Sequence, residues 1–185
     1  MARIALALFF LATSACVPIG QNIPPLVSAA RTGDVKQIAT LIRNGADPNQ
    51  PAGVNGWTPL MHAIHKHQLA AARALIDNGA DVNARVHDDG TALHMAAGYG
   101  YTEMVEMLLE KGANPHAQMT DGMNALDLAV LGVPDIDKFT VTDCQGGTIG
   151  ALLRHAPDLH LQGRSTAVRA VAAAKLRACA MTGGI

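Results

Sequence analysis

The chain has 185 residues and a net charge of −1 at pH 7, which allows one domain with a real core and gives no overall attraction to nucleic acid or to an anionic membrane. Apolar residues make up 49% of the sequence but aromatic residues only 3%, so the core must be built from aliphatic side chains. Because there is no block of like charges and no long low-complexity stretch, we expect one compact body with an extra N-terminal segment.

The N-terminal segment, residues 1–15, is typical of a cleaved export signal. Arg3 precedes an uninterrupted apolar run over 4–12, which is too short to span a bilayer as a helix, and small residues then lead to Cys16. We therefore exclude residues 1–15 from the fold and expect the mature protein in the periplasm, outside the cytoplasm.

Two cleavage patterns compete at this point. Ser14-Ala15-Cys16 resembles the end of a bacterial lipobox, in which Cys16 carries the lipid and becomes the new N-terminus, although Thr13 departs from the usual Leu. The alternative is ordinary signal-peptidase cleavage after Ala15. We favour a lipoprotein in which Cys16 is the only contact with the membrane and residues 16–24 form a tether.

A phrase that returns along the chain decides the architecture. NGADPN occupies 44–49, NGADVN 78–83 and KGANPH 111–116, at steps of 34 and 33 residues. A fixed period in this range is typical of a solenoid, in which each unit buries its apolar side against the next. Alignment on the phrase gives four units, at about 25–53, 54–86, 87–119 and 120–163.

These units resemble the ankyrin repeat in their linked motifs: GWTPLMHAI and GTALHMAAG at the start, a V-x-x-L-L helix, and NGADxN at the end. The resemblance covers about 25–160 and is strongest in repeats two and three. It implies an all-α solenoid of four helix-turn-helix units, with projecting loops that resemble β-hairpins. It also implies a non-catalytic module that binds another protein through its concave face.

Local signals agree with two short helices in each unit. Thr58 can cap the free N–H groups of a helix that begins at Pro59. Gly33 and Gly100 stand between the helices of repeats one and three, where a left-handed residue ends the first helix. His67 takes that position in repeat two, a departure that predicts backbone strain.

Repeat four breaks the period. The step from Leu109 to Leu153 is 44 residues, so about eleven residues are inserted between its two helices, near 132–145. Such an insertion is either functional or a local elaboration held by Cys144.

A capping helix is predicted over 165–180, within a C-terminal segment of 164–185. One apolar side is expected to face the last repeat, with Lys175 as a polar exception on that side. The predicted apolar side comprises Val168, Val171, Ala172, Leu176 and Cys179.

The three cysteines are an odd number for an exported protein. If Cys16 is lipidated, Cys144 and Cys179 can pair in an oxidising compartment. The alternative is two buried free thiols. We favour the disulfide, which would tie the last repeat to the capping helix.

The histidines His62, His65 and His67 are the best candidates for a metal site and define the alternative function, a metal-binding or metal-dependent protein. No carboxylate or cysteine accompanies them, and the H-E-x-x-H pattern is absent. In the ankyrin register His65 is exposed on the first helix, so we interpret it as a recognition residue and expect neither a metal nor another cofactor. The resemblance gives His94, in TALH, a structural role in bracing adjacent units.

Partner binding is expected on the loop tips and first helices of repeats two to four. The only tryptophan and the only two tyrosines of the chain map there, and aromatic side chains are enriched in interface hot spots. No sequence signal indicates catalysis, and we expect a monomer whose role is that of an inhibitor, an immunity-type protein or a scaffold. The predicted contact residues are Asn55, Trp57, His65, Lys66, His87, Asp89, Tyr99, Tyr101, Asp121 and Met123.

Overall fold

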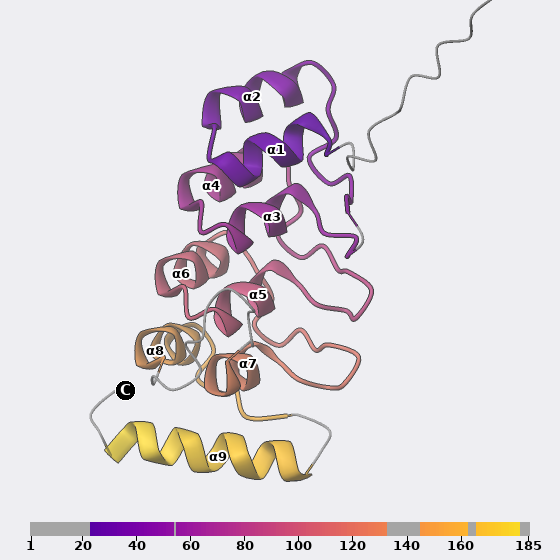
Figure 1. Ribbon diagram of the computed structural model, residues 1–185. Coiled ribbons are helices and arrows are strands. Elements are labelled where there is room, and N and C mark those ends of the chain that lie inside the picture. The colour runs from indigo at the N-terminus through magenta and orange to yellow at the C-terminus, as the bar shows by residue number, and fades with distance from the viewer. Residues whose placement is uncertain (1–22, 54, 133–144, 163–165, 182–185) are drawn as a thin grey trace, which may run out of the picture.

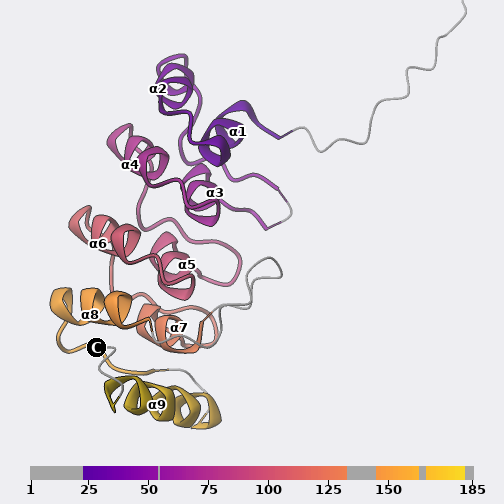
Figure 2. The same cartoon turned by 60° about the vertical axis from the view of Figure 1, so that its left-hand side comes forward.

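The computed structural model describes residues 23–53, 55–132, 145–162 and 166–181, and it shows a stack of helix pairs (Figure 1). The first helices of the pairs form one row and the second helices another, while the long loops project to one side of the stack (Figures 1 and 2). Within these ranges the chain forms helices only, apart from one isolated bridge between Ala52 and Trp57. The predicted all-α ankyrin solenoid is therefore confirmed.

Four helix pairs and one further helix make up this part of the chain. The helices are α1 (Pro25–Thr32), α2 (Val35–Arg43), α3 (Pro59–His65), α4 (Leu69–Asp77), α5 (Ala92–Gly98), α6 (Thr102–Glu110), α7 (Ala125–Leu131), α8 (Gly146–His155) and α9 (Thr166–Met181). Among the described helices, none has the length and apolarity needed to cross a bilayer.

The core follows the two leucine registers of the repeats. The first helices pack against one another in the order α1, α3, α5 and α7, and the second helices pack beside them. Small residues such as Ala63 and Ala97 are fully buried, which lets neighbouring helices approach closely. The buried leucines from corresponding positions include Leu26, Leu60, Leu93, Leu126, Leu75, Leu108 and Leu152.

Helix ends form where the sequence predicts them. The Thr58 side chain accepts a hydrogen bond from the Met61 backbone N–H, and Pro59 begins α3. Gly33 and Gly100 adopt φ values of 80° and 72°, and His67 adopts 56°. The predicted left-handed residue between the helices of a unit is thus present even where it is not glycine.

The last residue of the NGADxN phrase joins one repeat to the next. Asn49 donates to the Gly79 carbonyl at 3.2 Å and accepts from the Asp81 N–H at 2.7 Å, across a separation of about thirty residues. One repeat later the same two bonds, of 3.0 and 2.8 Å, connect Asn83 with Gly112 and Asn114. The phrase recurs because each copy supplies the contact that holds the following copy.

The capping helix α9 packs on α7 at the C-terminal end of the stack (Figure 1). Ala172 is fully buried, Leu176 is partly buried against the core, and the Lys175 ammonium donates to the Leu131 carbonyl at 3.3 Å. The expectation for Val171 was wrong, because its side chain is 59% exposed. On a helix Val171 lies about 100° from Ala172, so a side centred on Ala172 and Leu176 turns it towards solvent.

Candidate protein-binding surface

The loops and the first helices α3, α5 and α7 border one side of the stack, which we call the concave face. Each first helix begins beside its projecting loop and ends at the tight turn to the second helix. Side chains on these helices and loops therefore line one surface across several repeats. This surface carries two features, a row of rings and a pocket.

The aromatic row comprises Trp57, His65, Tyr99, Tyr101 and His67. Ring centroids lie 5.2 Å apart for Trp57 and His65, 5.8 Å for His65 and Tyr99, 5.3 Å for Tyr99 and Tyr101, and 4.1 Å for Tyr101 and His67. The last two pairs are stacked. His65 Nδ1 also lies 2.9 Å from the Tyr99 hydroxyl, within hydrogen-bond distance. Each ring is held by its neighbours, so little side-chain entropy remains to be lost when a partner binds.

The row follows from the repeat period. His65 and Tyr99 are 34 residues apart, and so are His67 and Tyr101. Stacked units bring residues about one repeat apart side by side. Repeats two and three align at a step of 33, with His67 at the position of Gly100, so each of these contacts reaches one residue beyond the corresponding position. The two histidines of repeat two therefore meet the two tyrosines of repeat three.

His67 carries the backbone strain that the sequence predicts at this position. A non-glycine residue in the left-handed region costs about 1–2 kcal/mol. A stacked ring pair contributes roughly 0.5–1.5 kcal/mol beyond its buried area, so the contact with Tyr101 offsets much of that cost. Strained residues cluster at functional positions, which fits a place in the row.

A pocket of about 330 Å³ lies beside the row, and Trp57 and Tyr99 line it together with four methionines. We call it the methionine pocket. Met61 comes from α3, Met95 from α5, and Met119 and Met123 from the loop that precedes α7. The pocket therefore draws on three consecutive repeats. Its volume falls at the lower end of the range for ligand sites in proteins, which is roughly 300–1,000 Å³.

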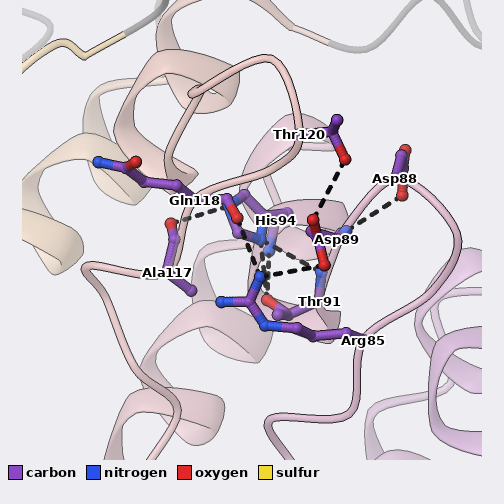
Figure 3. Close-up of polar contacts among 9 residues, drawn as sticks. Arg85, Asp88, Asp89, Thr91, His94, Ala117, Gln118 and Thr120 are labelled. Atoms are coloured by element: carbon purple, nitrogen blue, oxygen red, sulfur yellow. Dashed lines mark hydrogen bonds and ion pairs between the residues drawn. The ribbon is translucent and has the colours of Figure 1, made fainter.

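His94 lines the methionine pocket and connects α5 to the loop that leads to repeat four. Its Nδ1 accepts from the Thr91 backbone N–H at 3.2 Å, so its Nε2 carries the proton and donates to the Ala117 carbonyl at 3.1 Å (Figure 3). Burial lowers the pKa of His94 below its usual value, although the Ala117 carbonyl acts in the opposite direction. The neutral ring braces α5 against the loop that leads to repeat four, the structural role that the resemblance implies.

The loop tips of repeats three and four are also joined. The Thr120 N–H donates to the Asp88 carbonyl at 2.9 Å, and the Thr120 hydroxyl donates to the Asp89 carboxylate at 3.2 Å (Figure 3). Asp89 also forms an ion pair with Arg85 at 3.4 Å. These contacts connect the loop tips of repeats three and four at the edge of the concave face.

The structure brings half of the predicted contact residues together. His65, Tyr99 and Tyr101 lie in the aromatic row, Trp57 belongs to both the row and the methionine pocket, and Met123 lines the pocket. His65 is half-buried, where the sequence predicts exposure, because the rings of Trp57 and Tyr99 lie against it.

The other five predicted residues lie around these features. Asn55 shares a smaller hollow of about 170 Å³ with Trp57 and His65, and the His87 ring rests against Gly56. The remaining positions are Lys66 at the end of α3, Asp89 at one loop tip and Asp121 at the next.

The three candidate metal ligands have other contacts. His62 Nε2 lies 3.4 Å from the Ala52 carbonyl, and burial lowers the pKa of this histidine. His65 meets Tyr99, and His67 stacks on Tyr101. In the part of the chain that the structure describes, no group of three histidine, cysteine or acidic side chains is placed to hold a metal ion.

Sequence reasoning missed two parts of this surface. It assigned His67 a strained turn and a place among the candidate metal ligands, and it did not compare this histidine with the residues about one repeat further on, among which is Tyr101. It also missed Met61, Met95 and Met119. Met61 and Met95 are 34 residues apart, as His65 and Tyr99 are, whereas Met119 lies in a loop whose course the repeat period does not give.

Several predictions fall outside the described residues. They concern the lipid on Cys16, the insertion near 132–145 with Cys144, and the side chain of Cys179. The disulfide and the anchor therefore stay predictions.

Comparison with known proteins identifies the repeat. A family model described as ankyrin repeats (3 copies) matches residues 8–86, 26–119 and 85–139. The chain is 34% identical over 140 residues to the ankyrin repeat and KH domain-containing protein mask-1 of Caenorhabditis elegans, a match that covers 75% of this chain and 5% of the relative.

Two other relatives come from distant organisms. The chain is 32% identical over 118 residues to a putative ankyrin repeat-containing protein of Treponema pallidum, covering 64% of this chain and 40% of that protein. It is 39% identical over 110 residues to alpha-latrocrustotoxin-Lt1a of Latrodectus tredecimguttatus, covering 59% of this chain and 8% of the toxin. The chain thus spans less than half the length of each of these relatives.

Proposed function

This chain belongs to the ankyrin-repeat family, and from that premise we propose that it is a non-catalytic module that binds a partner protein through its concave face. Members of the family generally bind other proteins and are generally not catalysts. The observation that carries the proposal is the aromatic row, in which five rings from two repeats are held against one another beside an apolar pocket. Preorganised aromatic side chains are favoured anchors in protein interfaces.

The first test is a pull-down with mature protein, residues 16–185, from the envelope fraction of the source cell. Tyr99→Ala removes the ring that contacts both His65 and Tyr101, and we expect it to weaken capture of the partner by about tenfold or more, as for a hot-spot residue. Glu103→Ala, at an exposed position of α6, is the matched control and should capture the partner as the unchanged protein does. Recovery of every partner by variants of Trp57, Tyr99 and Tyr101 would exclude the concave face.

We further propose that the protein is exported to the periplasm and anchored through a lipid on Cys16. Arg3, the apolar run over 4–12 and the small residues before Cys16 support export, and the position of Cys16 supports the lipid. Mass spectrometry of the mature protein should find a diacylglycerol adduct on Cys16. Cys16→Ala should release the protein from the membrane fraction, and an unmodified Cys16 would exclude the anchor.

The role that we propose is that of an inhibitor, an immunity-type protein or a scaffold for a periplasmic enzyme. Addition of stoichiometric mature protein to the purified partner separates these roles. An inhibitor lowers the activity of the partner, whereas a scaffold leaves it unchanged or stabilises it.

A further inference from the structure

The methionine pocket offers a specific apolar site within the concave face. Met61, Met95, Met119 and Met123 line it, and Leu128 adds a branched apolar side chain from α7. Thioether side chains are flexible and polarisable, so they adapt their shape to different apolar groups. The pocket is large enough for one bulky side chain.

The polar groups of His94 and Thr91 in the pocket wall already have hydrogen-bond partners. Both ring nitrogens of His94 have partners, and the Thr91 hydroxyl lies 2.9 Å from His94 Nδ1. These groups therefore offer little to a polar ligand, whose burial without hydrogen bonds would be costly. The pocket selects an apolar group.

Two exposed carboxylates stand in the loops that contribute to the pocket, and we call them its rim. Asp88 lines the pocket, and Asp121 lies in the next loop, two residues before the lining residue Met123. Each carboxylate accepts a backbone N–H from two residues further on, at 3.1 and 3.0 Å, and neither forms an ion pair within the described part of the chain. The nearby cation Arg85 is paired with Asp89. The rim is thus complementary to a positive charge.

We propose that the methionine pocket receives a large apolar side chain of the partner protein, and that a lysine or arginine next to it in the partner's sequence meets Asp88 and Asp121. This inference rests on the proposed function and adds the chemistry of the bound segment. The apolar group supplies binding free energy by leaving water, and the rim carboxylates select for the adjacent cation.

The test is selection of a random heptapeptide phage library on immobilised mature protein. The unchanged protein should enrich peptides in which Leu, Met or Phe stands beside Lys or Arg. Asp88→Lys/Asp121→Lys should replace the basic preference by an acidic one and keep the apolar residue. Enrichment of peptides without the apolar–basic pair, no enrichment, or a preference unchanged by the lysine variant would overturn the proposal.

The selected peptide then serves as a probe in solution. Trp57 is the only tryptophan and lines the pocket, so its fluorescence reports occupancy. Met123→Trp fills the pocket, and we expect it to weaken binding about tenfold or more when measured by isothermal titration calorimetry. Lys36→Ala, at an exposed position of α2, should bind as the unchanged protein does, and circular dichroism melting confirms that each variant is folded. If the Met123→Trp variant bound the selected peptide with the affinity of the unchanged protein, the pocket would be excluded as the binding site.

Failure of this inference is distinguishable from failure of the proposed function. If the partner needs Tyr99 but tolerates Met123→Trp and the rim variant, the concave face binds without the pocket. If the partner tolerates Tyr99→Ala and every other change in the aromatic row, the proposed function itself fails.

Discussion

At the scale of single residues, His94 shows how one side chain links a helix cap to the next repeat. Its Nδ1 accepts from Thr91 and its Nε2 donates to Ala117, an arrangement that only the neutral ring can make. A proton on Nδ1 would turn an acceptor into a donor that faces another N–H. The two hydrogen bonds therefore require a neutral ring at this buried position.

The lowered pKa of His94 predicts a dependence of stability on pH. Because the folded-state pKa lies below the usual value near 6.5, the unfolded chain binds more protons as pH falls, so stability is complete above about pH 6.5 and decreases below it. His94→Gln should lower stability by about 1–3 kcal/mol at pH 7.5. Thermal melting between pH 7.5 and 5 should then show a shallower loss of Tm for the variant than for the unchanged protein.

His62, whose pKa burial also lowers, remains in both proteins and contributes equally to both profiles. Parallel pH profiles of Tm would therefore show that His94 titrates alike in the folded and unfolded chains.

At the scale of elements, the start of α7 replaces the Thr–His pair of α5 by Asn124 and Asp127. Both side chains are fully buried. Asp127 accepts from the Asn124 N–H at 3.0 Å, and it also accepts from the Gln162 N–H at 3.1 Å. One carboxylate thus caps α7 and holds the chain that runs from α8 towards α9.

We predict that Asp127→Ala lowers the free energy of unfolding by about 2–4 kcal/mol, because a helix cap and hydrogen bonds to a buried charged group are lost together. Urea unfolding followed by circular dichroism measures this change. Asp158→Ala is the control, since that side chain is 79% exposed and lies 3.7 Å from His116 in a surface pair. The control should change stability by less than about 0.5 kcal/mol, and an equal effect of both variants would contradict the capping role.

At the scale of the whole molecule, α9 closes the C-terminal end of the stack. The repeats leave an apolar side at each end of the array, and α9 covers that of α7 with Ala172 and Leu176. Terminal caps of this kind keep a solenoid soluble.

Deletion of residues 164–185 should therefore lower stability by at least about 2 kcal/mol, or roughly 4–8 °C in Tm for a chain of this size, and promote self-association. Differential scanning calorimetry and size-exclusion chromatography measure the two effects. Val171→Ser is the matched change on the exposed side of α9 and should be tolerated within about 0.5 kcal/mol. A monomeric deletion variant with unchanged Tm would show that the end of the stack needs no cap.

Much of this architecture can be predicted from the sequence, because the repeat period indicates which residues of neighbouring repeats will lie in contact. Residues about one repeat apart become neighbours when equal units stack, as for His65 with Tyr99 and for the 2.6 Å ion pair between Asp77 and Lys111. The same reasoning extends to the asparagines that end the repeated phrase. These contacts join neighbouring repeats, although the residues that make them are about thirty positions apart in the sequence.

The amino-acid sequence alone predicts the stack: the units, the helix ends and the glycine-like conformation of His67. The buried side of α9 and the residues that line the methionine pocket become clear only in the three-dimensional fold. The pocket joins Met61 and Met95, which lie on first helices, to Met119 and Met123 of a projecting loop. Their meeting depends on how loops and first helices of successive units are placed in space, and a linear period carries no such information.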